Sequence, residues 1–183
     1  MAEKRKYDAF SRGSIEVCRI MKPDDANLAG NVHGGTILKM IEEAGYIIAT
    51  RHFNKFRESS SKESPFLAGL ARVERTDFLQ PLYIGEVAEV YAELSYASQH
   101  SLEVKVYVWG ESLVTGKRRM ANQASLWYVP IKETKEKNIG VVPPLNYSSK
   151  EEEEKGRRRY EAQKASRQKK QELLCKVCGE TAK

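Results

Sequence analysis

A pair of glycines placed directly before a strongly periodic apolar segment constrains this chain more than any other feature. Between residues 36 and 50 the apolar residues recur at helical spacing and form one continuous face, made of Ile37, Met40, Ile41, Ala44, Ile47 and Ile48. The preceding stretch, residues 24–35, is polar and ends in Gly34 and Gly35. The sequence therefore predicts a buried helix from about His33 to His52 that follows a glycine-containing loop.

The first turn of such a helix is chemically useful, because its N–H groups have no partner within the helix. The helix dipole adds positive charge there, which stabilises a negative charge that develops nearby. Gly34 and Gly35 have no Cβ to keep a ligand from the backbone, and Asn27, Asn31 and His33 supply polar groups in the same loop. The pattern is compatible with anion binding or oxyanion stabilisation, and also with an ordinary loop-to-helix turn.

The rest of the first 130 residues predicts strands. Residues 14–21 alternate in the manner of a strand, and four later segments are rich in β-branched and aromatic residues: 66–75, 86–97, 102–109 and 119–129. One strand, one long helix and four further strands predict an α+β fold in which an antiparallel sheet wraps around one central helix. A single helix leaves sheet edges uncovered, so we expect two or more copies to pair.

The character of the chain changes after residue 145. We expect an N-terminal tail at 1–13, one folded domain at 14–145, and a charged helix and tail at 146–183. The helix is predicted from Tyr147 to Leu174, with Ser148 or Ser149 as its cap and Glu–Lys/Arg pairs at i,i+4 spacing. From residue 149 onward there are 11 basic and 7 acidic residues, but Tyr160 alone could stack on a base. A solvated surface helix is the preferred interpretation, with a partner-binding or nucleic-acid-binding arm as the alternative.

The apolar runs and the cysteines of the chain indicate its cellular compartment and whether it binds a metal or cofactor. No run of about 18 apolar residues predicts a membrane span, and the basic start is not followed by the apolar stretch of a secretion signal. Three cysteines, Cys18, Cys175 and Cys178, do not suggest a disulfide framework, so a reducing compartment such as the cytosol is expected. Cys175 and Cys178 have the spacing of half a zinc site, but no second pair exists, and neither a metal nor a cofactor is expected.

Several segments together resemble one known family. Residues 24–45, 71–79, 84–88 and 126–130 resemble the hotdog-fold acyl-CoA thioesterases, and most closely the first of two hotdog repeats in the cytosolic long-chain acyl-CoA thioester hydrolases of animals. The resemblance spans roughly residues 15–165. It implies a single hotdog domain that hydrolyses fatty acyl-CoA to a fatty acid and coenzyme A in the cytoplasm, without metal or cofactor. It also implies a homo-oligomer, either a dimer or a trimer of dimers.

The resemblance implies a pair of catalytic residues in this chain. In the two-repeat relatives an Asn in the loop of one repeat acts with an Asp on the helix of the other, and these positions match Asn27 and Glu42 here. Asn27 would position water or the thioester carbonyl, and Glu42 of a second subunit would be the general base. The chain departs from the pattern in having one repeat and in carrying Glu for Asp, a change that can cost much of the rate. The alternative is a catalytically weak hotdog subunit that binds acyl-CoA or assembles with an active relative.

The remaining candidates lie between these two residues in the sequence. The backbone N–H of Gly34 or Gly35 would stabilise the oxyanion, and His33 would cap the helix or contact substrate. In bacterial single-repeat relatives the catalytic acid occupies the position of Asn31, which as an amide can orient a group but cannot act as a base.

The orientation of Glu42 can be estimated from helix geometry. At 100° per residue, Glu42 lies about 160° from the centre of the apolar stripe and Glu43 nearer its edge. Glu42 is therefore predicted to face away from its own sheet, toward a partner subunit. An ordinary surface pair with Lys39 at i,i+3 is the structural alternative.

Basic residues could bind the phosphates of coenzyme A at the mouth of the pocket. Arg72, Arg75 and the run 117–119 are the candidates for this role. Alternatively, Arg72 forms a structural ion pair with Asp77.

Overall fold

The structure, a computed structural model, describes residues 13–58, 60–132 and 138–178, so the predicted N-terminal tail lies almost wholly outside it. The elements in chain order are β1 (Ser14–Ile20), the 3-10 helix η1 (Pro23–Asp25), α1 (Gly34–Phe53), β2 (Phe66–Phe78), β3 (Val87–Ala97), β4 (Leu102–Glu111), β5 (Arg118–Lys132), β6 (Asn138–Ile139) and α2 (Lys150–Cys178). The predicted order of one strand, one helix and four strands is confirmed. The sequence pattern missed η1 and β6, because elements of two or three residues have no periodicity to detect.

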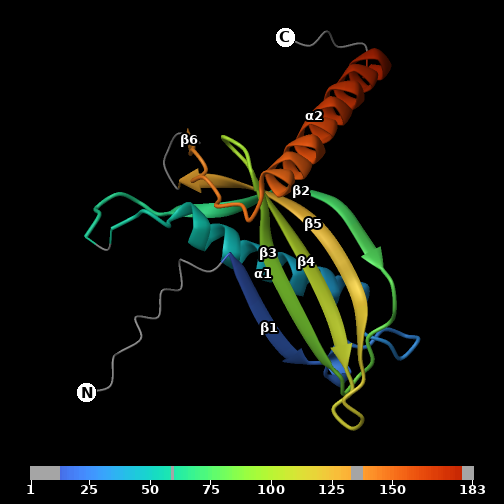
Figure 1. The fold of residues 1–183 in the computed structure, drawn as a ribbon. Coiled ribbons are helices and arrows are strands. Elements are labelled where there is room, and N and C mark those ends of the chain that lie inside the picture. Colours follow the sequence, from blue (N-terminus) through green and yellow to red (C-terminus); the bar gives the residue numbers. More distant parts are fainter. Residues whose placement is uncertain (1–12, 59, 133–137, 179–183) are drawn as a thin grey trace, which may run out of the picture. The chain divides into compact units, whose positions relative to one another are not determined.

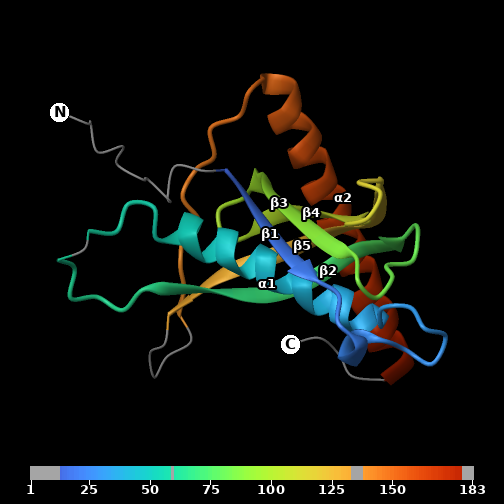
Figure 2. The same cartoon turned by 90° about the horizontal axis from the view of Figure 1, so that it is seen from below.

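All paired strands of the sheet are antiparallel, in the order β1-β3-β4-β5-β2, with the short β6 added beside β5. The sheet curves around α1, which lies against one of its faces (Figures 1 and 2). Among the described strands β2 pairs with β5 alone. Side chains of Thr50 and Asn54 bond to residues 66–68 of β2, and no described strand lies along the rest of its other edge. The predicted antiparallel sheet around one long helix is therefore confirmed.

The core lies between α1 and the face of the sheet that it covers. Along β4, Val104, Val106 and Val108 are fully buried and alternate with side chains that are partly exposed. This alternation is expected of an antiparallel sheet that buries one face. The helix contributes Ile37, Ile41 and other apolar residues to the same layer.

Helix α1 and the sheet approach each other closely at Gly45. A Cβ at this position would overlap the hydroxyl oxygen of Tyr128 on β5 and would lie 2.9 Å from its Cε2 and Cζ atoms. The Tyr128 hydroxyl, fully buried, donates a hydrogen bond of 3.0 Å to the backbone carbonyl of Glu42. Glycine is therefore required at this turn of α1 for close packing.

The chain divides into two compact units, the second of which begins at Leu145. The second unit contains α2, whose first turn is capped by the Ser149 hydroxyl, which accepts from the Glu152 amide at 3.2 Å. Glu154 and Arg158 form one of the predicted i,i+4 pairs at 2.8 Å. The side chains of residues 169–178 are outside those described, so the structure does not test the expectation that Cys175 and Cys178 bind no metal. Within the described ranges, no helix combines the length and apolar character needed to cross a membrane.

Candidate functional site

The loop before α1 is organised by Asn27. Its side-chain oxygen accepts hydrogen bonds from the backbone amides of Ala29 at 2.9 Å and Asn31 at 3.2 Å. The backbone N–H of Asn27 donates to the backbone carbonyl of Asn31 at 2.7 Å. Gly30 completes the turn with a φ of 80°, a value that favours glycine. The side-chain NH2 of Asn27 makes no hydrogen bond to any residue that the structure describes, so it can donate to a ligand.

The first turn of α1 has one amide that is bonded and one that is open. His33 is the N-cap, and its Nδ1 atom accepts from the Gly35 amide at 3.0 Å, so the predicted capping role is confirmed. The Gly34 amide has no hydrogen-bond partner within the described residues. Of the two predicted oxyanion donors, Gly34 is thus the one that is available, while the Gly35 amide is occupied by the cap.

A cavity of about 330 Å³ lies at this end of α1. One wall comes from the loop and the helix, with Asn27, Asn31, Val32, Gly34 and Ile37, and the other from Phe78, Leu79, Gln80, Pro81 and Leu82. A Cβ at Gly34 would lie 3.4 Å from the Phe78 ring, an ordinary contact distance, so the two walls of the cavity meet at Gly34 and Phe78. The cavity therefore combines apolar side chains with polar groups in comparable measure, and its concave shape is that of a small-molecule site.

The second wall of the cavity was not predicted from the sequence. Residues 78–82 carry no charge and lie between two predicted strands; residues 78 and 79 belong to a segment that resembles the family, but the resemblance assigned them no role at the site. They reach the site through backbone pairing, because the Leu82 carbonyl accepts from the Val32 amide at 2.9 Å and Asn31 forms a bridge with Tyr83.

Glu42 lies on α1 and is not among the residues that line the cavity of its own chain. The chain thus brings Asn27, Asn31 and Gly34 together and leaves Glu42 outside. Its side chain is half-buried, whereas Glu43 is exposed. Burial raises the pKa of Glu42 above the ordinary value of 4.5, and the charge of Glu43 raises it further.

The predicted orientation of Glu42 was wrong in detail. The buried residues of α1 centre about 100° from Glu42 and about 160° from Glu43, so Glu43 is the outermost of the two. The stripe is rotated for two reasons: Ala49 and Phe53, which the predicted face left out, are buried, and so are Gly45 and His52, which are not apolar by sequence. Ile47, in contrast, is only half-buried. The alternative pairing was also wrong, since Lys39 pairs with Glu43 at 3.8 Å.

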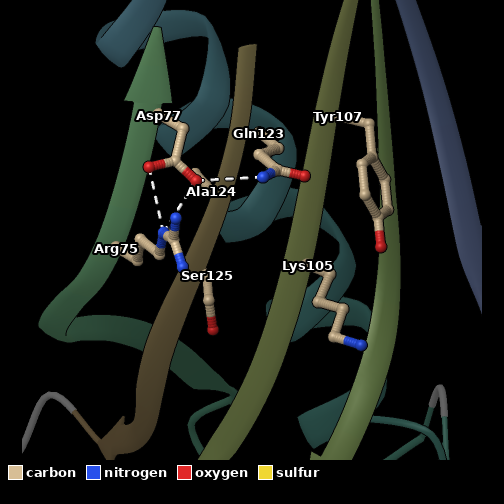
Figure 3. A pocket seen from close by; sticks show the side chains of 7 residues that line it. All are labelled: Arg75, Asp77, Lys105, Tyr107, Gln123, Ala124 and Ser125. Carbon is tan, nitrogen blue, oxygen red and sulfur yellow. Dashed lines mark hydrogen bonds and ion pairs between the residues drawn. The ribbon is translucent and has the colours of Figure 1, made fainter. Parts of the chain in front are cut away.

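The predicted basic residues for coenzyme A do not line the cavity. Arg75 pairs with Asp77 at 2.7 Å, and Asp77 also accepts from Gln123 at 2.9 Å; these side chains line a shallow hollow on the sheet face opposite α1 (Figure 3). Arg72 pairs with Glu74 at 3.0 Å, so the suggested Arg72–Asp77 pair was wrong.

In the run 117–119, both arginines are committed to carboxylates. Arg118 pairs with Glu89 and also lies over the Trp109 ring, 4.3 Å from its centre. Arg119 pairs with Glu86 at 2.7 Å. Neither arginine is free to serve as a phosphate site in this chain.

Comparison with known proteins gives concordant results. Residues 29–117 match the thioesterase superfamily. The cytosolic acyl coenzyme A thioester hydrolase of Homo sapiens is 58% identical over 155 residues, which are 85% of this chain and 40% of that protein, and the Rattus norvegicus protein is 57% identical over 84% of this chain and 39% of its own length. The chain thus spans about 40% of the length of these curated relatives.

Solved structures show the same fold. A point variant of acyl-CoA hydrolase from Staphylococcus aureus superposes with a TM-score of 0.68 at 25% identity, covering 90% of this chain and 95% of that one. Acyl-CoA hydrolase from Bacillus cereus gives a TM-score of 0.71 at 24% identity, covering 93% and 96%. The predicted hotdog fold is confirmed.

Proposed function

We propose that this chain, whose residues 29–117 match the thioesterase superfamily, hydrolyses fatty acyl-CoA thioesters to a free fatty acid and coenzyme A. The observation that carries the proposal is the cavity at the start of α1, which is lined by Gly34 and Asn27, two residues that each keep an unbonded N–H donor within the described part of the chain. The relatives named as cytosolic acyl-CoA thioester hydrolases support the substrate class and a cytosolic location.

The groups in the cavity have distinct roles in this proposal. The Gly34 amide, at the positive end of the helix, stabilises the oxyanion that forms when water attacks the thioester carbonyl. The NH2 of Asn27 orients the carbonyl or the attacking water, and Asn31 is a second orienting group. His33 acts indirectly, because by capping α1 it fixes the amides of the first turn.

The general base in this proposal is Glu42 of a second subunit. A raised pKa makes this carboxylate a better proton acceptor than an ordinary glutamate. Because Glu42 is not part of the cavity wall of its own chain, a complete site requires a second copy. The proposed oligomer is a dimer or a trimer of dimers.

The open edge of β2 supports the pairing of subunits. This strand of 13 residues exposes several large apolar side chains, with exposed fractions of 41% to 54%: Leu67, Leu70, Val73 and Phe78. Long exposed apolar edges are usually covered in native proteins, and a second copy of the same strand can cover this one by two-fold pairing. Phe78 belongs both to this edge and to the cavity wall, so the pairing would bring a partner close to the site.

A subunit that binds acyl-CoA but turns it over weakly, or that assembles with an active relative, is the second candidate. The observation that favours it is that no carboxylate is among the described residues that line the cavity. If the partner's Glu42 does not reach the cavity, the site can hold a thioester without activating water.

The direct test measures coenzyme A release from palmitoyl-CoA by the parent and by Asn27→Ala and Glu42→Ala, with Glu43→Ala as the matched control on the same helix. Each variant is checked for oligomer size. We expect losses of about 10²–10⁴-fold for Glu42→Ala and little change for Glu43→Ala. No turnover from a folded, assembled parent would favour the weak-subunit candidate.

Mixing the two inactive variants tests whether the site is shared. If Asn27 of one subunit acts with Glu42 of another, a mixed dimer contains one intact site, and a random mixture regains about a quarter of the parent activity. If both residues act within one chain, mixing restores nothing. Failure to regain activity, with subunit exchange demonstrated, would refute the composite site.

A further inference from the structure

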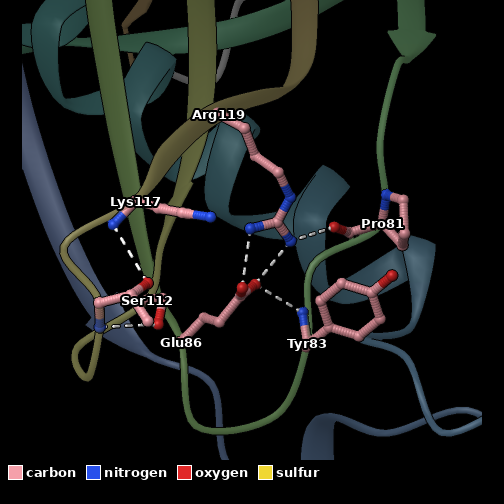
Figure 4. Close-up of polar contacts among 7 residues, drawn as sticks. Pro81, Tyr83, Glu86, Ser112, Lys117 and Arg119 are labelled. Atoms are coloured by element: carbon pink, nitrogen blue, oxygen red, sulfur yellow. Dashed lines mark hydrogen bonds and ion pairs between the residues drawn. The ribbon is translucent and has the colours of Figure 1, made fainter.

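Arg119 and Glu86 form a two-point ion pair beside Pro81, one of the residues that line the cavity. Arg119 Nη1 donates to Glu86 Oε1 at 2.7 Å, and Arg119 Nη2 donates to Glu86 Oε2 at 2.8 Å (Figure 4). The two side chains are 24% and 12% exposed. Two parallel charge-assisted bonds with little exposure to water make a rigid connection, unlike most surface ion pairs.

The pair also holds the backbone of the cavity wall. Arg119 Nη2 donates to the Pro81 carbonyl at 2.6 Å, and Glu86 Oε2 accepts from the Tyr83 amide at 2.9 Å. The guanidinium lies 5.2 Å from the centre of the Tyr83 ring (Figure 4). Residues 81–86 are thus tied to the first residues of β5 at several points.

The same loop is bonded to the chain that leads into α1. The Leu82 carbonyl accepts from the Val32 amide at 2.9 Å, and Tyr83 forms a bridge with Asn31. Val32 directly precedes the His33 cap and the Gly34 amide. A displacement of Pro81 or Leu82 would therefore also move residues 31–32, and with them the Gly34 amide that we assign to the oxyanion.

Gly110 on β4 leaves space for the side chains of Arg119 and Leu82. A Cβ at Gly110 would lie 3.3 Å from Arg119 Nη1 and 2.5 Å from Leu82 Cδ2. Arginine suits the position because its planar fork can bond both oxygens of Glu86 and the Pro81 carbonyl together, which a lysine ammonium cannot do with the same geometry.

We propose that Arg119 and Glu86 are positioning residues, which hold residues 81–83 against residues 31–32 and so set the place of the Gly34 amide and the cavity wall. For its effect on catalysis the inference rests on the proposed hydrolase function. The pair stays ionised at neutral pH, because Arg119 and the Tyr83 amide lower the pKa of Glu86 in spite of its burial, and Glu86 raises that of Arg119.

The test compares Arg119→Gln and the milder Arg119→Lys with Arg118→Gln. Arg118 is a matched control, since it lies next to Arg119 on β5 and its substitution removes an ion pair with Glu89. Within the described part of the chain, Arg118 makes no hydrogen bond to residues 78–82. Hydrogen exchange is followed at the amides of residues 26–36 and 79–86, and palmitoyl-CoA hydrolysis is measured with kcat and KM separated.

We expect Arg119→Gln to speed exchange in both segments by about tenfold or more, because the amides of Val32 and Tyr83 lose their support. The same variant should lower kcat by about 10–100-fold with a much smaller change in KM, since misplacement of the oxyanion donor acts on the transition state. Arg119→Lys should give an intermediate effect on both measurements. Arg118→Gln should leave exchange in these segments and kcat unchanged.

The outcomes separate this inference from the proposed function. Unchanged exchange in folded Arg119→Gln and Arg119→Lys overturns the positioning role whatever the activity. Faster exchange with unchanged kcat overturns its part in catalysis. An inactive parent means that the hydrolase proposal fails, and the exchange experiment then still decides whether the pair holds the cavity wall.

Discussion

Replacing Gly45 by Ala tests the contact that sets the rotation of α1. The added Cβ would overlap the Tyr128 hydroxyl, which donates to the Glu42 carbonyl, so either the helix or the tyrosine must move. Because Glu42 is one turn away on the same helix, the substitution should disturb both stability and the direction in which Glu42 points.

The expected magnitude is the balance of three terms. Overpacking at a buried site costs about 1–3 kcal/mol, and loss of the Tyr128–Glu42 hydrogen bond costs about 1 kcal/mol. Alanine in place of glycine within a helix returns up to about 1 kcal/mol. The net destabilisation is therefore about 1–3 kcal/mol, or a fall in Tm of about 2–4 °C for each kcal/mol in a chain of this size.

Denaturant unfolding of the parent, Gly45→Ala, Tyr128→Phe and the double variant provides the measurement. Tyr128→Phe removes the atom nearest to the new Cβ, so Gly45→Ala should be less harmful in that background, by about 1 kcal/mol. A neutral or stabilising effect of Gly45→Ala in the parent would mean that helix propensity outweighs packing and would refute the close approach. Strict additivity in the double variant would refute the role of Tyr128.

Further predictions concern the cap and two titrating groups. His33→Ala should destabilise the fold by about 0.5–2 kcal/mol, measured by denaturant unfolding, and should lower kcat, whereas a purely structural cap would leave kcat intact. Burial lowers the pKa of His52 below 6.5 while its Nε2 atom donates to the Pro143 carbonyl, so stability should be complete above about pH 6.5 and should fall as the pH drops toward the folded-state pKa. His52→Gln should flatten that part of the Tm–pH curve. Burial and the neighbouring charge raise the pKa of Glu42, so the acidic limb of kcat/KM should lie above pH 4.5, and Glu43→Gln should move it downward.

The sequence was sufficient for the fold because its elements are long and clearly patterned. The helical repeat of α1 and the alternation along β4 each extend over ten or more residues, and one strand, one helix and four strands leave few arrangements. The start of the site was also predictable, because Asn27, Asn31 and Gly34 are close together in the chain and precede a helix. Local chemistry of this kind depends little on tertiary packing.

What could not be predicted depends on contacts between distant residues. Residues 78–82 enter the site through one hydrogen bond to Val32 and a bridge to Asn31, and no residue type marks that pairing. The direction of Glu42 depends on the contact between Gly45 and Tyr128, which are 83 positions apart in the sequence. A helical wheel that counts only the apolar residues of 36–50 gives no weight to Gly45, His52 or Phe53, which are all buried, and it misplaces the buried stripe for that reason.

The positions of donors and base within one chain explain why assembly and catalysis are linked in the proposed function. The donors at Asn27 and Gly34 are fixed by local bonds and need no partner subunit to be in place. The base, in contrast, is absent from the cavity of its own chain and projects from the flank of α1. An isolated subunit can then hold a thioester in a polarised state but lacks the group that removes a proton from water. Activity per subunit should therefore rise with protein concentration over the range in which subunits associate, while substrate affinity should depend on concentration far less. Equal turnover by monomer and oligomer would require a base within the chain and would exclude Glu42 of a partner from that role.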